Sequence, residues 1–138
     1  MSALSPSPAL REASAWLYDS IAAEPGYHPQ FEFLRSALGQ GKARAGIGRA
    51  SGECRAPEAA KLALEVLGEL DGVGFLLANI TASEDLSMQE FSAAALYLEE
   101  AARVQTPGGP DMEVSMTVDD SFNDELRIIL IATDDRMR

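Results

Sequence analysis

Residues 73–80 read VGFLLANI and residues 126–132 read LRIILIA, two almost unbroken apolar runs of strand length. A strand that is apolar on both faces is usually buried on both, so we expect these runs to be the central strands of one sheet. Two weaker strands are predicted at residues 42–50, which are rich in small residues, and at residues 112–118, where apolar and polar residues alternate. We expect these two to be edge strands, and we expect residues 112–118 to have one solvent-exposed face.

Helical spacing of apolar residues predicts a leading helix over residues 8–24, which ends before the breaker pair Pro25-Gly26. A loop over residues 27–30 then leads to a short helix over residues 31–38. This part of the chain precedes the strand pattern, and we treat residues 8–41 as a segment of its own. Residues 1–7 are expected to be a flexible lead-in.

Two amphipathic helices separate the predicted strands. The first begins at Pro57, since proline favours the first helical position, and we expect it to turn inward Ala59, Ala63, Val66, Leu67 and Leu70. Ser87 and Glu90 have the spacing of a capping box and predict the start of the second. Its core face should carry Phe91, Ala94, Ala95, Leu98 and Ala102. The pattern β-α-β-α-β-β over residues 42–134 predicts an α+β domain.

The composition restricts the partners of the chain. Its 138 residues suit one domain, and 22 Asp and Glu against 11 Lys and Arg give a net charge of −11. Such a charge disfavours binding to nucleic acid or to an anionic membrane. The one cysteine, Cys54, excludes an intramolecular disulfide and fits a reducing cytoplasm. No stretch is long and apolar enough to cross a membrane.

Motifs for catalysis are absent. Gly46-Ile47-Gly48 belongs to no complete phosphate-binding loop, and His28 is the only histidine, so we expect no cofactor and no metal site. Cys54 has no basic partner fixed by sequence and is interpreted as a packing residue. The acidic pairs Glu84-Asp85 and Asp119-Asp120 are interpreted as solvated turns. On residue chemistry alone, no active site is visible.

Three segments nevertheless resemble a known family in order and spacing. They are Gly46-x-Gly48-x-Ala50-x-Gly52-Glu53-x-Arg55, then Asn79-Ile80-Thr81 followed by Asp85 and Glu90, and finally residues 124–133, DELRIILIAT. Together they resemble the C-terminal domain of FtsZ over about residues 44–133, with weaker similarity back through residues 8–38. The resemblance implies structural roles for Gly46, Gly48, Gly52, Glu53, Arg55, Asn79, Thr81, Asp85 and Glu90. Ala82-Ser83, where the family has two glycines, and Ser115, where it has one, are departures.

The same resemblance implies a fold. It is a two-layer sandwich of a mixed four-stranded sheet in the order 1-4-2-3 with two packed helices, preceded here by the leading and the short helix. This order places residues 73–80 and 126–132 in the middle, as the apolar runs independently indicate. The GTP-binding half of FtsZ, with its glycine-rich loop, has no counterpart in the sequence.

FtsZ builds its GTPase between subunits, and the loop after its central helix supplies an Asn and two Asp residues. Alignment with the family backwards from Gly46 without gaps places Tyr27, Pro29 and Glu32 at these three positions. Alignment forwards from Pro25-Gly26 places Pro29, Phe31 and Leu34 there instead. No aspartate occurs between Asp19 and Asp71, and Glu32 is the one acid available to replace a family carboxylate. We therefore expect no catalytic residue, with Glu32 as the only candidate.

Three hypotheses follow from the resemblance. The first is a non-catalytic module that binds or caps filaments of FtsZ or another tubulin-like GTPase in cell division, through a loop face of Tyr27, His28, Pro29, Gln30, Phe31 and Glu32. The second is a split GTPase, in which a separate chain binds GTP and Glu32 contributes to hydrolysis. The third is a self-associating structural domain, monomer or homodimer, that pairs through the sheet face left open by the two packed helices. In each case we expect a cytoplasmic protein.

Overall fold

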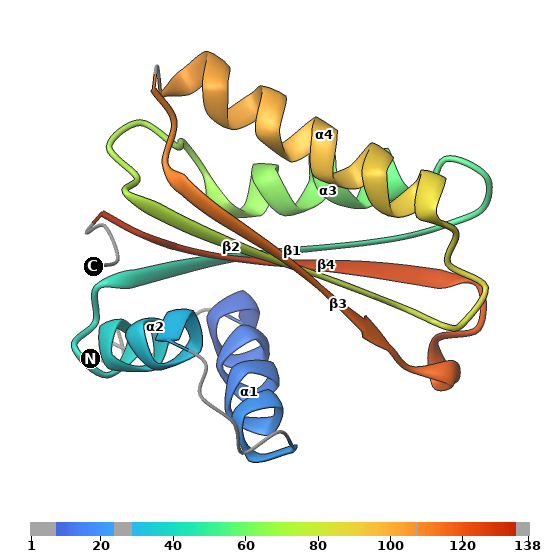
Figure 1. Ribbon diagram of the computed structural model, residues 1–138, viewed down its shortest axis with the longest axis horizontal. Coiled ribbons are helices and arrows are strands. Elements are labelled where there is room, and N and C mark those ends of the chain that lie inside the picture. Colours follow the sequence, from blue (N-terminus) through green and yellow to red (C-terminus); the bar gives the residue numbers. More distant parts are fainter. Residues whose placement is uncertain (1–7, 24–28, 107, 135–138) are drawn as a thin grey trace.

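The computed structural model describes residues 8–23, 29–106 and 108–134, so the predicted lead-in lies outside the described residues. The elements follow one another as α1 (Pro8–Ala23), α2 (Pro29–Gly39), β1 (Ala43–Ser51), α3 (Arg55–Leu67), β2 (Phe75–Ala82), α4 (Met88–Gln105), β3 (Asp111–Val118), the 3-10 helix η1 (Asp120–Phe122) and β4 (Glu125–Thr133). Figure 1 shows their arrangement around one twisted sheet.

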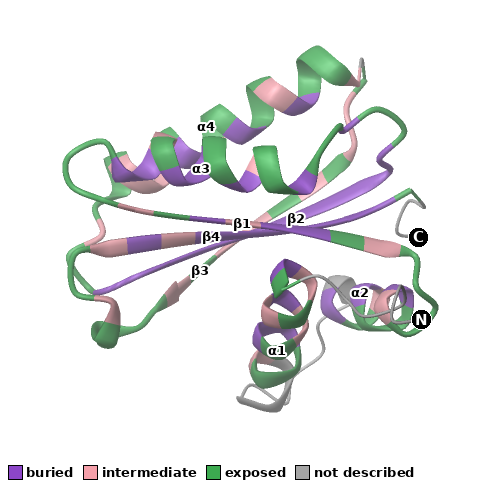
Figure 2. Cartoon of the chain, turned by 180° about the vertical axis from the view of Figure 1, so that it is seen from behind, coloured by how far each residue is buried: buried purple, intermediate pink, exposed green. Residues whose placement is uncertain are grey.

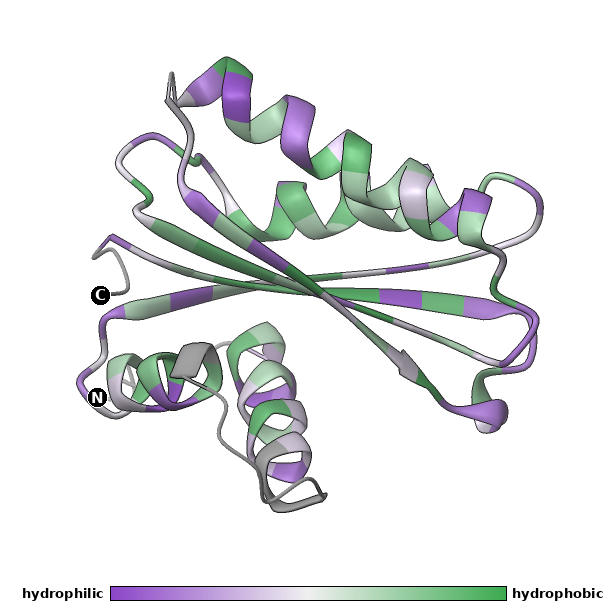
Figure 3. Ribbon diagram, viewed as in Figure 1, coloured by the Kyte–Doolittle hydropathy of each residue, from purple (hydrophilic) through white to green (hydrophobic). Residues whose placement is uncertain are grey.

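The sheet has the strand order β1-β4-β2-β3, which confirms the predicted order and the α+β class. β2 and β3 run parallel, whereas β4 is antiparallel to both β1 and β2. Every residue of β2 is buried, and β4 is buried from Ile128 to Thr133. The two apolar runs are therefore the central strands, and they form the hydrophobic centre of the sheet in Figure 3.

Helices cover both faces of the sheet. α3 and α4 lie on one face, as predicted for the sandwich, while α1 and α2 lie against the opposite face (Figure 1). Each side has its own core, and the residues buried between helices and sheet are visible in Figure 2. On the α1 side the buried apolar strand residues are Ala45, Phe75, Leu77, Ile129 and Ile131. The self-association hypothesis assumed that this sheet face is open, and that assumption is wrong.

α3 packs very closely on the sheet, and it is rotated about its axis relative to the core face that its hydrophobic pattern predicts. It starts at Arg55 rather than Pro57, and its buried residues are Arg55, Ala56, Ala59, Ala60, Ala63 and Leu67. Val66, expected in the core, is 55% exposed. The reason is close approach to β1: a Cβ on Gly46 would lie 2.7 Å from the Leu67 nitrogen, so not even a methyl group fits between helix and strand at this position.

Other boundaries differ by a few residues from the sequence-based ones. β2 continues to Ala82, since its backbone stays paired to β3 beyond the apolar run. In the first half of β3, Met112 and Val114 pack against the core as predicted. In the second half the burial reverses, because Ser115 and Thr117 are half-buried while Met116 and Val118 are exposed. The start of α4 agrees with prediction, because Ser87 and Glu90 form a complete capping box.

Candidate functional site

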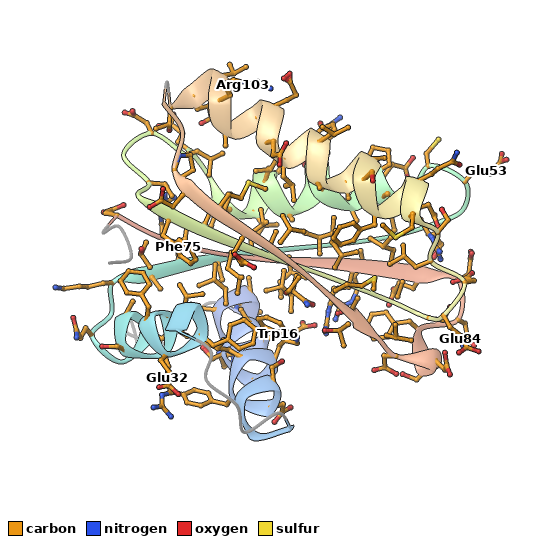
Figure 4. All side chains as sticks on the ribbon, viewed as in Figure 1. Trp16, Glu32, Glu53, Phe75, Glu84 and Arg103 are labelled. Atoms are coloured by element: carbon orange, nitrogen blue, oxygen red, sulfur yellow. The ribbon has the colours of Figure 1, made fainter. Side chains whose placement is uncertain are left out.

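The segment predicted to bind a partner lies at the start of α2. Tyr27 and His28 lie outside the described residues. Pro29 and Gln30, predicted as loop, form the first turn of the helix, because proline is favoured there. Glu32 is exposed, points away from the body of the molecule in Figure 4, and forms an ion pair with Arg35 one turn later.

Phe31 has a packing role in the same segment. Its side chain is only 8% exposed, and its ring meets that of Trp16 edge to face, with centroids 5.6 Å apart. Phe33 makes a similar contact with Phe75 of the sheet, also at 5.6 Å. Such aromatic pairs bury large areas and fix orientation. α2 therefore packs against both α1 and the sheet, and Glu32 lies on its solvent side.

The family-motif residues Arg55, Asp85 and Glu90 meet at the opposite end of the domain. Arg55 is 3% exposed, and its guanidinium donates from Nε to Glu90 Oε2 at 2.8 Å and from Nη2 to Glu90 Oε1 at 3.0 Å. Nη2 also donates to Asp85 Oδ1 at 3.2 Å, and Nη1 donates to the carbonyl oxygen of Asp124 at 2.8 Å. One side chain thus joins α3, the β2–α4 connection and the β3–β4 connection.

These contacts alter the acidity of all three groups. The hydrogen bond to Glu90 raises the pKa of Arg55 above its ordinary value, although burial acts in the other direction. The same hydrogen bond lowers the pKa of Glu90. The Ser83 hydroxyl, and after it Arg55, lower the pKa of Asp85. At neutral pH the cluster is therefore held fully charged, which suits a structural clamp better than proton transfer.

Ser83 completes this clamp and was missed as a functional residue by sequence reasoning. Its Oγ lies 2.6 Å from Asp85 Oδ1 and 2.7 Å from the carbonyl oxygen of Asn123. The signal was its departure from the family pattern, where a glycine would offer no hydroxyl. Ser83 thus adds a link between the β2–α4 and β3–β4 connections.

The remaining family-motif residues at this end are two glycines and an acid. Gly48 packs beneath α3, where a Cβ would lie 2.6 Å from the Ala63 nitrogen. Gly52 has a φ of +95°, which L-residues with side chains rarely adopt, and it turns the chain between β1 and α3. Glu53 is exposed in the same connection and lies at the tip of the loop (Figure 4).

Asn79 and Thr81 form a polar strip on the sheet face that carries α1. Asn79 Nδ2 donates to Ser115 Oγ at 3.1 Å and to Thr117 Oγ1 at 3.0 Å, and Thr81 Oγ1 donates to Asn79 Oδ1 at 2.7 Å. Arg127 extends the strip, since its Nη2 donates to Thr81 Oγ1 at 3.3 Å. Ser115, another departure from the family pattern, is therefore a hydrogen-bond partner of a motif residue.

Glu12 joins this strip to α1. Its Oε2 accepts a hydrogen bond from Arg127 Nη1 at 3.0 Å and also pairs with Arg49 of β1. The Arg127 guanidinium lies 5.1 Å from the centre of the Phe122 ring, a cation–π contact. These charged contacts help to orient α1, and no sequence motif predicts them because they join residues far apart in the chain.

A cavity of about 290 Å³ lies between α1 and this end of the sheet. It is lined by Glu12, Ala15, Trp16, Asp19, Thr81, Thr117, Asp119 and Arg127. Three carboxylates outnumber the one guanidinium, so the cavity disfavours a phosphate or nucleotide. Among the residues that the structure describes, no group of three or more His, Cys, Asp or Glu side chains is arranged to hold a metal ion.

No helix in the described part of the chain is long and apolar enough to span a bilayer.

Residues 41–135 match the sequence model of the FtsZ family, C-terminal domain. Among solved structures, an empty FtsZ dimer from M. jannaschii is 26% identical, with a TM-score of 0.57 over 66% of this chain. The W319Y mutant of the same FtsZ, also 26% identical over 66% of the chain, gives a TM-score of 0.55. The chain covers 26% and 27% of those two proteins, respectively.

TubZ from Bacillus thuringiensis serovar israelensis, solved as GDP-form protofilaments, is a more distant match. It has 10% identity and a TM-score of 0.53, and the match covers 69% of this chain and 26% of TubZ. At this identity the likeness concerns the fold alone. The chain thus spans about a quarter of the length of each of the three structures.

Proposed function

The chain belongs to the FtsZ family through its C-terminal domain, and on this premise we propose that it is a non-catalytic module that binds or caps filaments of FtsZ or another tubulin-like GTPase. We place this activity in bacterial cell division, in the cytoplasm. FtsZ forms a dimer in one similar structure and TubZ forms protofilaments in another, which supports a role at such filaments.

The observation that carries the proposal is a retained fold without the catalytic acids. The four strands and two packed helices of the domain are all present from β1 to β4. No aspartate lies between Asp19 and Asp71, the region in which FtsZ carries its two catalytic aspartates. The one acid at the aligned positions, Glu32, is paired with Arg35. Such a module offers a filament an interaction surface, but it lacks the aspartates that in FtsZ act on the water that attacks GTP.

We propose that the docking surface comprises Tyr27, His28, Pro29, Gln30 and the solvent side of α2 around Glu32. Phe31 contributes indirectly, since its burial against Trp16 fixes the orientation of α2. The 138 residues contain no glycine-rich loop of the GTP-binding half, which in FtsZ meets the next subunit. The proposal is that a filament end occupied by this domain alone stops growing.

The test is sedimentation of FtsZ polymers with GTP, with and without the chain. We expect the chain to reduce the polymer mass at substoichiometric amounts and to be found in the pellet. Glu32→Lys should weaken both effects, whereas Glu58→Lys, the same charge change on exposed α3 in the opposite layer, should leave them unchanged. An unchanged polymer mass without co-sedimentation would contradict the proposal.

The split GTPase remains the second candidate, and the same samples distinguish it. Glu32 is exposed and so is accessible to a neighbouring nucleotide. If the chain completes a GTPase, mixing it with the nucleotide-binding partner must increase GTP turnover, and Glu32→Ala must abolish that increase. Stimulated turnover that is lost in Glu32→Ala would replace the capping proposal.

A further inference from the structure

α4 carries exposed apolar side chains in addition to its buried face. Its inner face buries Ala94, Leu98 and Ala102 against the sheet. Its outer face carries Leu96, Tyr97 and Val104, of which Leu96 is 59% and Val104 is 80% exposed. A surface helix normally has one apolar face and one polar face. The exposed apolar residues of α4 therefore need an explanation other than the packing of this domain.

Two open depressions lie along the outer face. One depression, of about 640 Å³, is lined by Leu64 of α3 and by Ala93, Leu96, Tyr97, Glu100, Ala101, Val104 and Gln105 of α4. A second depression shares Ala93 and Leu96 and extends the first to Met88. We call the two together the outer groove. It follows the 18 residues of α4, a length of about 27 Å.

The dimensions of the outer groove suit a helix. A bound helix of four to five turns has about this length, and amphipathic helices dock through apolar residues spaced at i, i+3, i+4 and i+7. Leu96, Tyr97 and Val104 would meet such residues along the groove. A flat or strand-like partner would not use the long hollow beside α4.

The charge of the α3–α4 layer indicates the charge that a bound helix should carry. Of the charged side chains, Glu100 lines the groove itself, and the exposed charges on the whole α3–α4 layer are four carboxylates against two cations: Glu58, Glu65, Glu99 and Glu100 against Lys61 and Arg103. Arg103 is already paired with Glu100. The whole chain has a net charge of −11. A helix with Lys and Arg beside its apolar stripe is attracted to this surface, whereas a second copy of the chain is repelled.

We propose that the outer groove binds a basic amphipathic helix of another protein. α3 and α4 form the layer opposite α2 (Figure 1), so this interaction is independent of the filament surface proposed above. The chain then has two separate interaction faces, one on each side of its sheet.

The test uses two fluorescently labelled model peptides of about 18 residues, both helical with leucines at i, i+4, i+7 and i+11. One has lysines beside the leucine stripe, and the other has glutamates there. Fluorescence anisotropy should show saturable binding of the lysine peptide and at least about tenfold weaker binding of the glutamate peptide. Equal affinity for both peptides, or binding of neither, would overturn the proposal.

A charge-matched pair of variants separates groove binding from general attraction to an acidic protein. Leu96→Asp places a carboxylate in the groove and should weaken binding of the lysine peptide about tenfold. Tyr18→Asp adds the same charge at a 47% exposed residue of α1 and should leave the affinity unchanged. Val104→Asp repeats the test at a second groove position. If both Asp variants in the groove bind as well as Tyr18→Asp does, the groove is not the site.

The oligomeric state tests the competing occupant. Sedimentation equilibrium of the free chain should give a monomer, since two copies repel each other. A dimer that dissociates in Leu96→Asp would show that a second copy fills the groove, and it would overturn the proposal.

Discussion

Arg55 binds both carboxylate oxygens of Glu90, through Nε at 2.8 Å and Nη2 at 3.0 Å. This fork-to-fork geometry joins the first turn of α3 to the first turn of α4, the two helices that cover one face of the sheet. Glu90 also accepts from the backbone nitrogen of Ser87 in the capping box. A single carboxylate thus caps one helix and anchors the other.

Removal of the arginine should destabilise the domain strongly. Arg55→Ala leaves Glu90, whose side chain is 25% exposed, and the Asp124 carbonyl without their donor, and the loss of such charged hydrogen bonds costs about 1.5–3 kcal/mol. Arg55→Lys should recover only part of this loss, because an ammonium does not reproduce the bidentate contact. Urea unfolding followed by far-UV circular dichroism measures both changes.

The matched control is Arg103→Ala on α4. Arg103 pairs with Glu100 at the surface, with 68% of its side chain exposed, and surface pairs of this kind contribute at most about 1 kcal/mol. A loss in Arg55→Ala no larger than that in Arg103→Ala would mean that the clamp does not hold the connections together.

The same clamp predicts a dependence of stability on pH. Arg55 lowers the pKa of Glu90 below its ordinary value of 4.5 in the folded state, so the folded chain binds fewer protons than the unfolded chain in acid. The stabilisation is fully present above that value and is lost as the pH falls through the lower pKa of the folded state. Asp85 acts in the same direction.

Glu90→Gln isolates this effect. The free energy of unfolding of the variant should lie well below that of the unchanged protein near neutral pH. The difference should stay constant down to the ordinary pKa of 4.5 and shrink as the pH falls further, through the lower pKa of the folded state. Glu99→Gln, on the exposed side of the same helix, should show a small difference at every pH. A Glu90→Gln difference that is constant with pH would contradict the assigned protonation.

The sequence predicted local features better than distant ones. The central strands, the capping box of Ser87 and Glu90 and the β-α-β-α-β-β order depend on neighbouring residues or on a continuous apolar pattern, and the structure confirms them. The exposure of Val66 was not predictable from helical spacing, because two glycines on another element set the orientation of α3. Tertiary contact thus overrode the local pattern.

The candidate sites show the same division. The family motifs identified Arg55, Asp85 and Glu90 as structural residues without showing that they form one cluster. Glu12 and Arg127 are 115 positions apart, and nothing in their local sequence pairs them. The outer face of α4 was also missed, since a search for the core face of a helix leaves Leu96 and Val104 without a role.

The docking of α1 has a built-in reporter. Trp16 is the only tryptophan of the chain and is 9% exposed between α1 and α2. Its fluorescence should therefore be blue-shifted in the native protein and should change in the same transition as the far-UV circular dichroism. Leu17→Asp, which places a charge in the core beneath α1, should shift the emission to the red while the β-sheet signal persists.

The tryptophan experiment also tests whether α1 covers the sheet in solution. Tyr18→Asp, on the exposed side of the same helix, should leave the emission unchanged. Red-shifted emission from the unmodified chain would show that α1 is not docked, and the sheet face would again be open to a partner.

α3 packs on β1 so closely that Gly48 cannot carry a side chain without strain. A Cβ on Gly48 would overlap the backbone of α3, lying 2.6 Å from the Ala63 nitrogen. The obstacle is helix backbone rather than a movable side chain, so Gly48→Ala should cost about 1–3 kcal/mol of unfolding free energy and Gly48→Val more.

Gly39→Ala is the control, because nothing lies within 4 Å of a Cβ there and alanine restricts the unfolded chain. Gly39→Ala should be neutral or slightly stabilising. Equal effects of the two alanine substitutions would mean that α3 does not approach β1 this closely, and the exposure of Val66 would then need another cause.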